Sequence, residues 1–322
     1  MKKKPFLVGS IIILSVLLVG YWYFVHLRPL PSVQAAFIMP VDEYGVIAPD
    51  GTFMYTSLQT LIDLQTGVES SNDPAYQLKL DVAWPFLHLS PDGRYLTAKS
   101  VEDRNHNYLL DMKEKTYQED SYLCKSWSGD STRCVEVFDG QLIEMPANKV
   151  IEGWNRKEDF RKLSNVSGDA TILWDMKRKI PVAHIINKGM AGKLSLASYS
   201  YDQYNPDPEH AIILPILEIQ PPREIVSFVF DPSGQYILLA VWEHEGEYQV
   251  DDYDTSTVTD TVLILVDWRA KENKEIFRIS SIDPKHVAVS RGAGSLEWSS
   301  DGSTILVYRY YAPAVVLKIK YP

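Results

Sequence analysis

Short apolar runs alternate with polar turns along most of the chain. A four-residue turn recurs between these runs, and Ser90-Pro91-Asp92-Gly93 is its clearest copy. Looser copies, mostly entered and left by apolar or aromatic residues, begin at residues 48, 128, 167, 231 and 299. Recurrence of one turn between apolar runs is typical of a repeat architecture. The pattern therefore predicts repeated units of antiparallel β-strands.

The spacing of the copies predicts a β-propeller. The first four copies are about 40 residues apart, which is the length of one four-stranded blade. The last two intervals, between the copies at 167, 231 and 299, are 64 and 68 residues. We interpret the additional length of the first of these intervals as an extra pair of strands, at 194–201 and 211–219, which form a blade with a degenerate turn. The additional length of the second interval, at 243–257, is interpreted as a long hairpin insertion. The prediction is an all-β propeller of about seven blades, with six or eight as alternatives.

A second element recurs in phase with the turn. It is an apolar run that closes with an acidic or polar residue, and we predict it as the third strand of a blade at 61–67, 108–112, 173–176 and 264–268. Closing the ring requires strands from both ends of the chain. Residues 37–39 and 314–319 have the apolar pattern to supply them, and their pairing would remove the exposed sheet edges.

Two of these segments resemble a known family. The run at 90–96, Ser-Pro-Asp-Gly-Arg-Tyr-Leu, and the run at 298–305 are similar to the repeats of TolB-type and related WD-repeat-like β-propellers. The resemblance spans roughly residues 46–320 and implies the fold, but it implies little about chemistry. The Gly-His signature of true WD repeats is missing, and the Trp-Asp pair at 174–175 is isolated.

The N-terminus has a different pattern. Three lysines at 2–4 precede an uncharged, mainly aliphatic run at 5–25. About 20 apolar residues in a helix cross the core of a bilayer, and the preceding lysines predict a cytoplasmic N-terminus. We therefore predict a cytoplasmic tip and transmembrane signal anchor at 1–28, a linker at 29–36, and a propeller domain at 37–322. The domain would lie outside the cytoplasm, at the cell surface or in the periplasm. The alternative is a signal peptide cleaved near residues 33–36.

Composition and charge narrow the class of partner. Of the 322 residues, 45% are hydrophobic and 23% are charged, which is ordinary for a globular protein. Residues 1–28 carry four of the 32 basic residues and none of the 42 acidic ones, so the remainder has a net charge of −14. Such a domain would be repelled by the phosphate backbone, which argues against nucleic acid as a partner.

The two cysteines, Cys124 and Cys134, flank the turn at 127–130 symmetrically. A hairpin centred on Gly129 would place them opposite each other, and in an oxidising compartment they would form a disulfide. The alternative is a pair of free, buried thiols.

Residues 103–114 have oxygen-bearing side chains at the spacing of an EF-hand-like calcium loop. The sixth position, which is glycine in such loops, is Tyr108, and no flanking helices are expected. Our main interpretation is a turn that leads into a strand. The alternative is a calcium ion held by Asp103, Asn105 and Asn107. No other cofactor is expected.

No catalytic motif is present. The sequence has no nucleophile elbow, zinc-protease helix, phosphate-binding loop or dinucleotide fingerprint. The acidic stretch at 243–260 is interpreted as solvated, with recognition as the alternative. A site at the mouth of the propeller channel would use residues near the inner strands, and the candidates are Trp84, His88, Arg223, Glu224 and Arg291.

These observations favour a membrane-anchored, extracytoplasmic propeller that binds a protein or an envelope component without catalysis. One alternative is an anchored hydrolase or lyase with its site in the central funnel. Another is an accessory subunit that docks into a membrane complex through its helix.

Overall fold

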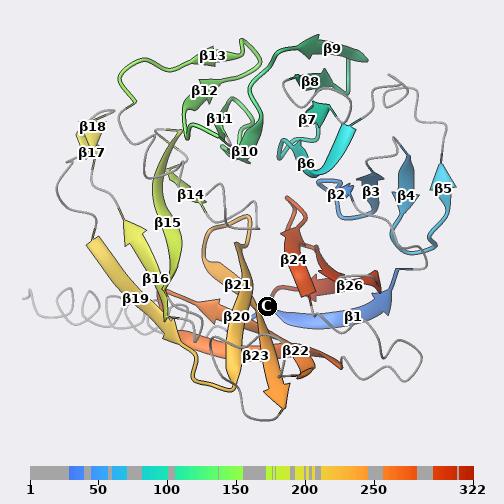
Figure 1. Ribbon diagram of the computed structural model, residues 1–322, viewed down its shortest axis with the longest axis vertical. Coiled ribbons are helices and arrows are strands. Elements are labelled where there is room, and N and C mark those ends of the chain that lie inside the picture. The colour runs from blue at the N-terminus through green and yellow to red at the C-terminus, as the bar shows by residue number, and fades with distance from the viewer. Residues whose placement is uncertain are drawn as a thin grey trace, which may run out of the picture.

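The chain is a β-propeller in which four-stranded antiparallel sheets form a ring (Figure 1). The computed structural model describes residues 29–39, 45–56, 60–70, 82–100, 106–136, 138–154, 172–175, 177, 179–188, 193–198, 201–202, 205–206, 212–245, 257–280, 293–309 and 312–322. These residues contain no helix long and apolar enough to cross a membrane. The predicted anchor at 1–28 lies outside them.

The described residues form six blades, and the first five are built in chain order from the inner to the outer strand. The first blade contains β2 (Gly45–Ile47), β3 (Phe53–Thr56), β4 (Leu61–Asp63) and β5 (Glu69–Ser70). The second contains β6 (Val82–Leu89), β7 (Tyr95–Ser100), β8 (Asn107–Asp111) and β9 (Thr116–Glu119). The third contains β10 (Cys124–Trp127), β11 (Arg133–Glu136), β12 (Leu142–Glu144) and β13 (Lys149–Val150).

The later blades have longer strands. The fourth contains β14 (Ile172–Asp175), β15 (Ile180–Lys188), β16 (Lys193–Ser198) and β19 (Ile212–Glu218). The small hairpin of β17 (Tyr201–Asp202) and β18 (Asn205–Pro206) lies between its last two strands in the chain. The fifth contains β20 (Arg223–Phe230), β21 (Tyr236–Glu245), β22 (Thr257–Asp267) and β23 (Glu272–Ser280). The sixth contains β24 (Ala293–Trp298), β25 (Thr304–Arg309), β26 (Ala312–Lys320) and β1 (Ser32–Ile38).

The sixth blade closes the ring with strands from both ends of the described chain, which confirms the prediction. β1 runs antiparallel to β26, and Phe37 lies opposite Val316. β1 begins at Ser32, so residues 32–36 of the predicted linker belong to this sheet. With β1 in place, β26 has a paired strand on both sides, and its backbone hydrogen bonds are satisfied.

The six blades of the described residues are one of the alternatives to the predicted seven, and two strand assignments change. β16 and β19, predicted as part of a separate blade, are the third and fourth strands of blade four. β14, predicted as a third strand, is the first strand of that blade. The residues of the turn copy at 167–170 lie outside the described part of the chain. The predicted hairpin insertion is supported, because β21 and β22 stay paired as far as Glu245 and Thr257.

The recurring turn is a hydrogen-bonded connection between the first and second strands. In blade two the hydroxyl of Ser90 donates to Asp92 Oδ1 at 2.6 Å and accepts from the backbone N–H of Tyr95 at 2.8 Å. Gly93 follows with a φ of 71°, in the left-handed region that glycine adopts without steric cost. The same serine and aspartate contacts recur in the copies that begin at Ser128 and Ser299.

The copy in blade five keeps this frame with its polar groups exchanged. Asp231 stands at the serine position, and its carboxylate accepts from the hydroxyl of Ser233 and from the backbone N–H of Tyr236. The group that accepts from the backbone N–H of the second strand is therefore a carboxylate here and a hydroxyl in the copies that begin at Ser90, Ser128 and Ser299. This explains why the sequence of the copy is degenerate although its turn is not.

Neighbouring blades contact each other through their recurring turns, which all lie at one end of the propeller, here called the turn end. The backbone N–H of Asp92 donates to Ser131 Oγ at 3.2 Å, and that of Asp301 donates to the carbonyl of Pro49 at 2.9 Å. A Cβ on Gly93 would lie 2.9 Å from Pro49 Cγ, so this glycine is needed for close approach as well as for its backbone angle. At the remaining junctions Asp130 forms an ion pair with Lys179, and the hydroxyl of Tyr321 donates to Asp231. Gly234 lies so close to Leu173 that a Cβ on it would overlap this side chain.

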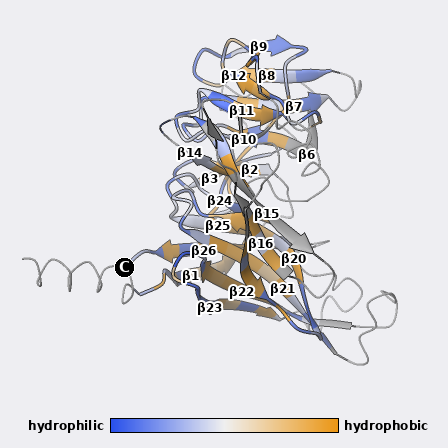
Figure 2. Ribbon diagram, turned by 90° about the vertical axis from the view of Figure 1, so that its left-hand side faces the viewer, coloured by the Kyte–Doolittle hydropathy of each residue, from blue (hydrophilic) through white to orange (hydrophobic). Residues whose placement is uncertain are grey.

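The core lies between the blades. Apolar positions are concentrated in the inner and middle strands, whereas the outer strand β9 is hydrophilic (Figure 2). One cluster joins blades five and six and includes Leu238, Leu265, Leu296, Ile305 and Leu317, all at most 3% exposed. Because such a blade is covered on both faces, its middle strands have long apolar runs, as β21 has from Ile237 to Val241.

The hydrogen bonds of the recurring turn predict that Ser299→Ala destabilises the protein. Ser299 is fully buried, and the substitution leaves the buried N–H of Thr304 without its acceptor. We expect the free energy of unfolding to fall by about 1–3 kcal/mol, measured by urea denaturation. The neighbouring Ser300→Ala, at an exposed position of the same turn, is the control and should change it by less than about 0.5 kcal/mol. Equal effects of the two substitutions would contradict this role.

Candidate functional site

A central cavity of about 430 Å³ lies at the turn end of the inner strands. All six blades contribute to its wall, since it is lined by residues of β2, β6, β10, β14, β20 and β24 or of the turns that follow them. Its volume is within the range of ligand sites, roughly 300–1,000 Å³. The cavity is therefore the candidate functional site of the propeller.

The wall is mainly apolar and aromatic. The large apolar side chains are Leu87, Leu89, Trp127, Ile172, Leu173, Trp174, Phe230, Leu296 and Trp298. The ionisable residues of the described lining are His88, Asp231 and Glu297, and the described lining includes neither lysine nor arginine. An anionic ligand would find no basic side chain there to offset its charge.

Both carboxylates of the lining are engaged in holding the fold. Glu297 accepts from the backbone N–H of Ile47 at 2.8 Å and from the hydroxyl of Tyr308 at 3.1 Å, so it joins blade six to blade one. Asp231 accepts from Tyr236 and Ser233 within its turn. A general acid or base must be free to exchange a proton with its substrate. These structural bonds therefore argue against a catalytic carboxylate pair formed by the two residues.

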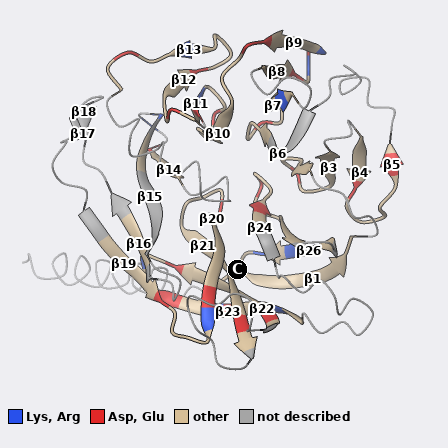
Figure 3. Cartoon of the chain, viewed as in Figure 1, with Lys and Arg blue, Asp and Glu red and all other residues tan. Residues whose placement is uncertain are grey.

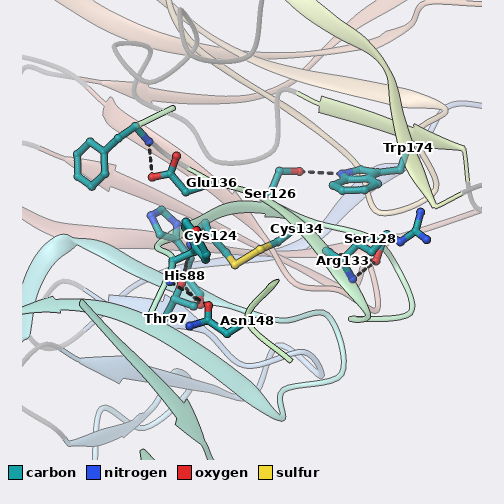
Figure 4. The surroundings of a disulfide bond; sticks show 12 residues. His88, Thr97, Cys124, Ser126, Ser128, Arg133, Cys134, Glu136, Asn148 and Trp174 are labelled. Carbon is teal, nitrogen blue, oxygen red and sulfur yellow. Dashed lines mark hydrogen bonds between the residues drawn. A yellow bond between two sulfur atoms is a disulfide. The ribbon is translucent and has the colours of Figure 1, made fainter. Parts of the chain in front are cut away.

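A disulfide between Cys124 and Cys134 joins β10 to β11 beside the cavity (Figure 4). The predicted bond is confirmed, but the predicted register is wrong. Cys134 lies opposite Trp127 and Cys124 lies opposite Glu136, because the pairing shifts between Cys124 and Ser126. The two Cα atoms are nevertheless 5.6 Å apart, and both side chains are fully buried. The bond thus fixes the strand that brings Ser126 and Trp127 to the cavity.

The indole groups of the cavity wall differ in their hydrogen bonds. Trp174 Nε1 donates to Ser126 Oγ at 2.9 Å, which joins blades three and four (Figure 4). Trp298 Nε1 donates to the carbonyl of Gly302, also at 2.9 Å. Trp127 Nε1 is buried and has no hydrogen-bond partner in the described structure. The Trp127 ring stacks on Tyr95 with the ring centres 6.4 Å apart.

Acidic side chains occupy the turns around the cavity. Asp50, Asp92, Asp130 and Asp301 are exposed there, and acidic positions are found around the ring in Figure 3. Burial opposes ionisation of Asp130, but hydrogen bonds from Lys179, Ser128 and Thr132 outweigh it and lower the pKa of this carboxyl well below its usual range. The pKa of Asp301 is also lowered, because hydrogen bonds from its own turn outweigh its burial. Both turns are therefore negatively charged at neutral pH.

The structure brings one of the five predicted channel residues, His88, to the cavity. Arg223 and Glu224 lie at the other end of β20, where Arg223 pairs with Glu243 and Glu224 Oε2 lies 3.5 Å from His244 Nε2. Arg223 instead lines a separate hollow of about 530 Å³ beside Pro222, Glu243 and His244, and burial lowers the pKa of His244. Trp84 belongs to β6, but its side chain, like the whole of Arg291, lies outside the described residues.

The predicted calcium loop is only partly described. Asp103 and Asn105 lie outside the described residues. Asn107 begins β8, and its buried Oδ1 has no hydrogen-bond partner within the described part of the chain. Asp111, at the ninth position of the loop, binds Arg94 at 2.9 Å and accepts from the backbone N–H groups of the next turn. This carboxylate is therefore used as the turns of other blades use theirs. No group of three His, Cys, Asp or Glu side chains suited to a metal ion occurs in the described ranges.

Most residues of the cavity wall were not predicted. Trp127, Phe230 and Trp298 each stand directly before a copy of the recurring turn. That position was the signal in the sequence, because the turn marks the end of the inner strand. Trp174 had no such signal, since no turn copy follows its strand.

Comparison with known proteins gives no family. No family model and no curated protein matches the chain. Among solved structures, Kuenenia stuttgartiensis hydrazine synthase is similar over 90% of this chain and 98% of its own, with 11% identity and a TM-score of 0.42. The WD40 repeats of RRP9 are similar over 91% and 100%, with 8% identity and a TM-score of 0.44. Oligogalacturonate lyase from Vibrio parahaemolyticus is similar over 88% and 73%, with 14% identity and a TM-score of 0.36. At such identities a likeness concerns the fold alone.

The disulfide predicts a loss of stability in the double variant Cys124→Ala/Cys134→Ala. Removing the disulfide gives the unfolded chain between the two residues more conformational freedom. We therefore expect the free energy of unfolding to fall by about 2–4 kcal/mol. Urea denaturation with and without a reductant measures this. The reductant should destabilise the unmodified protein and leave the double variant unchanged. An unmodified protein that is indifferent to complete reduction would contradict the prediction.

Proposed function

We propose that this protein is a non-catalytic binding module whose central cavity receives part of a partner, either a protein or an envelope component. The observation that carries the proposal is the composition of the cavity wall. Six blades converge on an apolar and aromatic surface, while the two carboxylates of the described lining are committed to the fold. Such a wall suits recognition through burial of apolar surface.

The hydrolase or lyase alternative depends on carboxylates that converge on a substrate. Asp231 and Glu297 are the carboxylates of the described lining, and each is tied to backbone N–H groups and hydroxyls. Binding is therefore the function that these contacts support best.

We further propose that the propeller is held outside the cytoplasm by the N-terminal anchor. Support comes from the three lysines followed by the apolar run at 5–25. The buried disulfide gives independent support, since structural disulfides persist in oxidising compartments.

A cavity-blocking substitution tests the binding function. Ser300 is an exposed residue of the cavity lining, and Ser300→Trp would place a large ring at the mouth. We expect full-length protein purified from native membranes in mild detergent to carry a stoichiometric companion, identified by mass spectrometry, and Ser300→Trp to reduce its recovery at least about tenfold. Thr116→Trp, on the exposed outer strand β9, is the matched control and should retain it. Equal recovery with the two variants, or turnover of an envelope substrate by the unmodified protein, would refute the proposal.

The topology predicts a simple protease experiment. In cells stripped of their outer layers but with intact membranes, added protease should degrade the propeller, and an antibody to a tag placed before Lys2 should still detect a short, protected N-terminal fragment. A cytoplasmic protein serves as the control for membrane integrity. Full protection of the propeller until detergent is added would contradict an extracytoplasmic location.

A further inference from the structure

The first described residues of the chain enter the fold at the turn end of the propeller. β25 begins at Thr304, shortly after a copy of the recurring turn, and Lys318 of β26 lies opposite it. β26 ends at Lys320, and Ser32, the first residue of β1, lies opposite Lys320. β1 therefore starts beside the turns and runs away from them.

The residues before β1 are fastened to this end. Pro31 is buried, and Leu30 packs against the apolar cluster that joins blades five and six. Tyr321 packs at the same place, where its hydroxyl donates to Asp231 at 3.5 Å and its ring lies beside Gly302. The chain is thus fixed to the turn end as far back as Leu30.

The cavity opens at the turn end as well. The exposed residues of its described lining are Gly129, Pro232, Ser233 and Ser300, and all four belong to the recurring turns. The described lining residues of the strands themselves are buried or half-buried. A ligand therefore enters the cavity from the turn end.

The short connection to the predicted anchor limits the orientation of the propeller. The apolar run ends at Val25, and Leu30 follows five residues later. An extended chain covers at most about 3.6 Å per residue, so this connection reaches roughly 18 Å. β1 has seven residues and runs about 23 Å toward the opposite end of the propeller. The connection is too short to pass along the blade, so the anchor lies on the side of the turn end.

We propose that the turn end faces the membrane and that the cavity receives an extracytoplasmic segment of an integral membrane protein in the same bilayer. The inference rests on the proposed anchor and binding function, and it specifies the partner. A ligand at the turn end has to occupy the space between the propeller and the bilayer, and the short connection keeps that space narrow. Segments of neighbouring membrane proteins project into it.

The charge of the cavity disfavours the lipids of the bilayer as its ligand. The described lining has two carboxylates and neither lysine nor arginine, and Asp92 is exposed directly after the lining residue Pro91. Carboxylates repel anionic headgroups, and their contact with the hydrocarbon core is costly. The apolar wall therefore suits a protein segment that is apolar and carries no net negative charge.

Energy transfer to the bilayer tests the orientation. Full-length protein is reconstituted into liposomes whose headgroups carry an acceptor dye. A donor dye is attached at Ser300→Cys in the turn end, or at Gln220→Cys, an exposed position before β20 at the opposite end. Because the two positions differ in height by about 25 Å, the length of β20, transfer from Ser300→Cys should be at least about twofold more efficient.

Equal transfer from the two labels, as for a propeller that lies on its side, would overturn the proposed orientation. Greater transfer from Gln220→Cys would also overturn it. Transfer from neither label would overturn the anchor, and the orientation with it.

Photo-crosslinking in native membranes tests the class of partner. A photoreactive phenylalanine analogue replaces Ser233, an exposed residue of the lining, or Gln220 as the matched control. We expect the analogue at Ser233, and not at Gln220, to crosslink a protein that stays in the membrane during extraction with alkaline carbonate. The crosslinked peptide should belong to an extracytoplasmic segment of that protein, and Ser300→Trp in the same chain should abolish the crosslink.

The other outcomes separate this inference from the function on which it rests. A crosslinked protein that carbonate releases, or a crosslink to lipid, would overturn the partner class and leave binding in the cavity standing. Absence of any crosslink specific to Ser233 would overturn the inference. The binding function fails with it only when Ser300→Trp also leaves recovery of the purified companion unchanged.

Discussion

Pairing of β1 with β26 is the interaction on which the rest of this structure depends. The two strands come from opposite ends of the described chain, and their pairing, with Phe37 opposite Val316, completes the last blade with the strand that precedes the first blade in the sequence. Each blade is apolar on both faces and is stable only when neighbours cover both. An open arc would leave the first and last blades half exposed. Closure thus allows strands such as β21 to be apolar throughout, and it also encloses the central cavity.

The recurring turn serves the fold and the site at once. Its serine and aspartate hold the link between the first two strands of a blade, and its backbone contacts the neighbouring blade, as Asp92 does with Ser131 and Asp301 with Pro49. Since the turn ends an inner strand, the residue before it lies at the cavity wall in four blades, as Leu89, Trp127, Phe230 and Trp298 do. Asp130 and Asp301 stay ionised at the rim because hydrogen bonds to their oxygens lower the pKa of each carboxyl; the donors belong to the turn itself and, for Asp130, also include Lys179 of blade four.

Blade three supplies the part of the cavity wall that lies beside the disulfide. The disulfide crosses from β10 to β11 beside Ser126 and Trp127, so the position of these two side chains is fixed by a covalent bond as well as by packing. Rigid placement reduces the entropy lost when a ligand is bound. The part of the cavity wall formed by Ser126 and Trp127 is therefore held by a covalent bond before any ligand arrives.

The sequence by itself determined the repeat and the closing strands and favoured the disulfide, because each depends on local pattern or on simple spacing. Four consecutive residues specify the recurring turn. The alternation of apolar runs and polar turns follows directly from strands that are buried in a blade. It did not determine the composition of blade four, where a strand without a turn copy, β14, occupies the inner position and β16 and β19 complete the sheet. Nor did it identify the cavity wall, of which His88 alone was among the predicted channel residues. Those outcomes depend on which strands pair across long separations and on which residues six blades bring to one axis, and these are decided only when the ring closes.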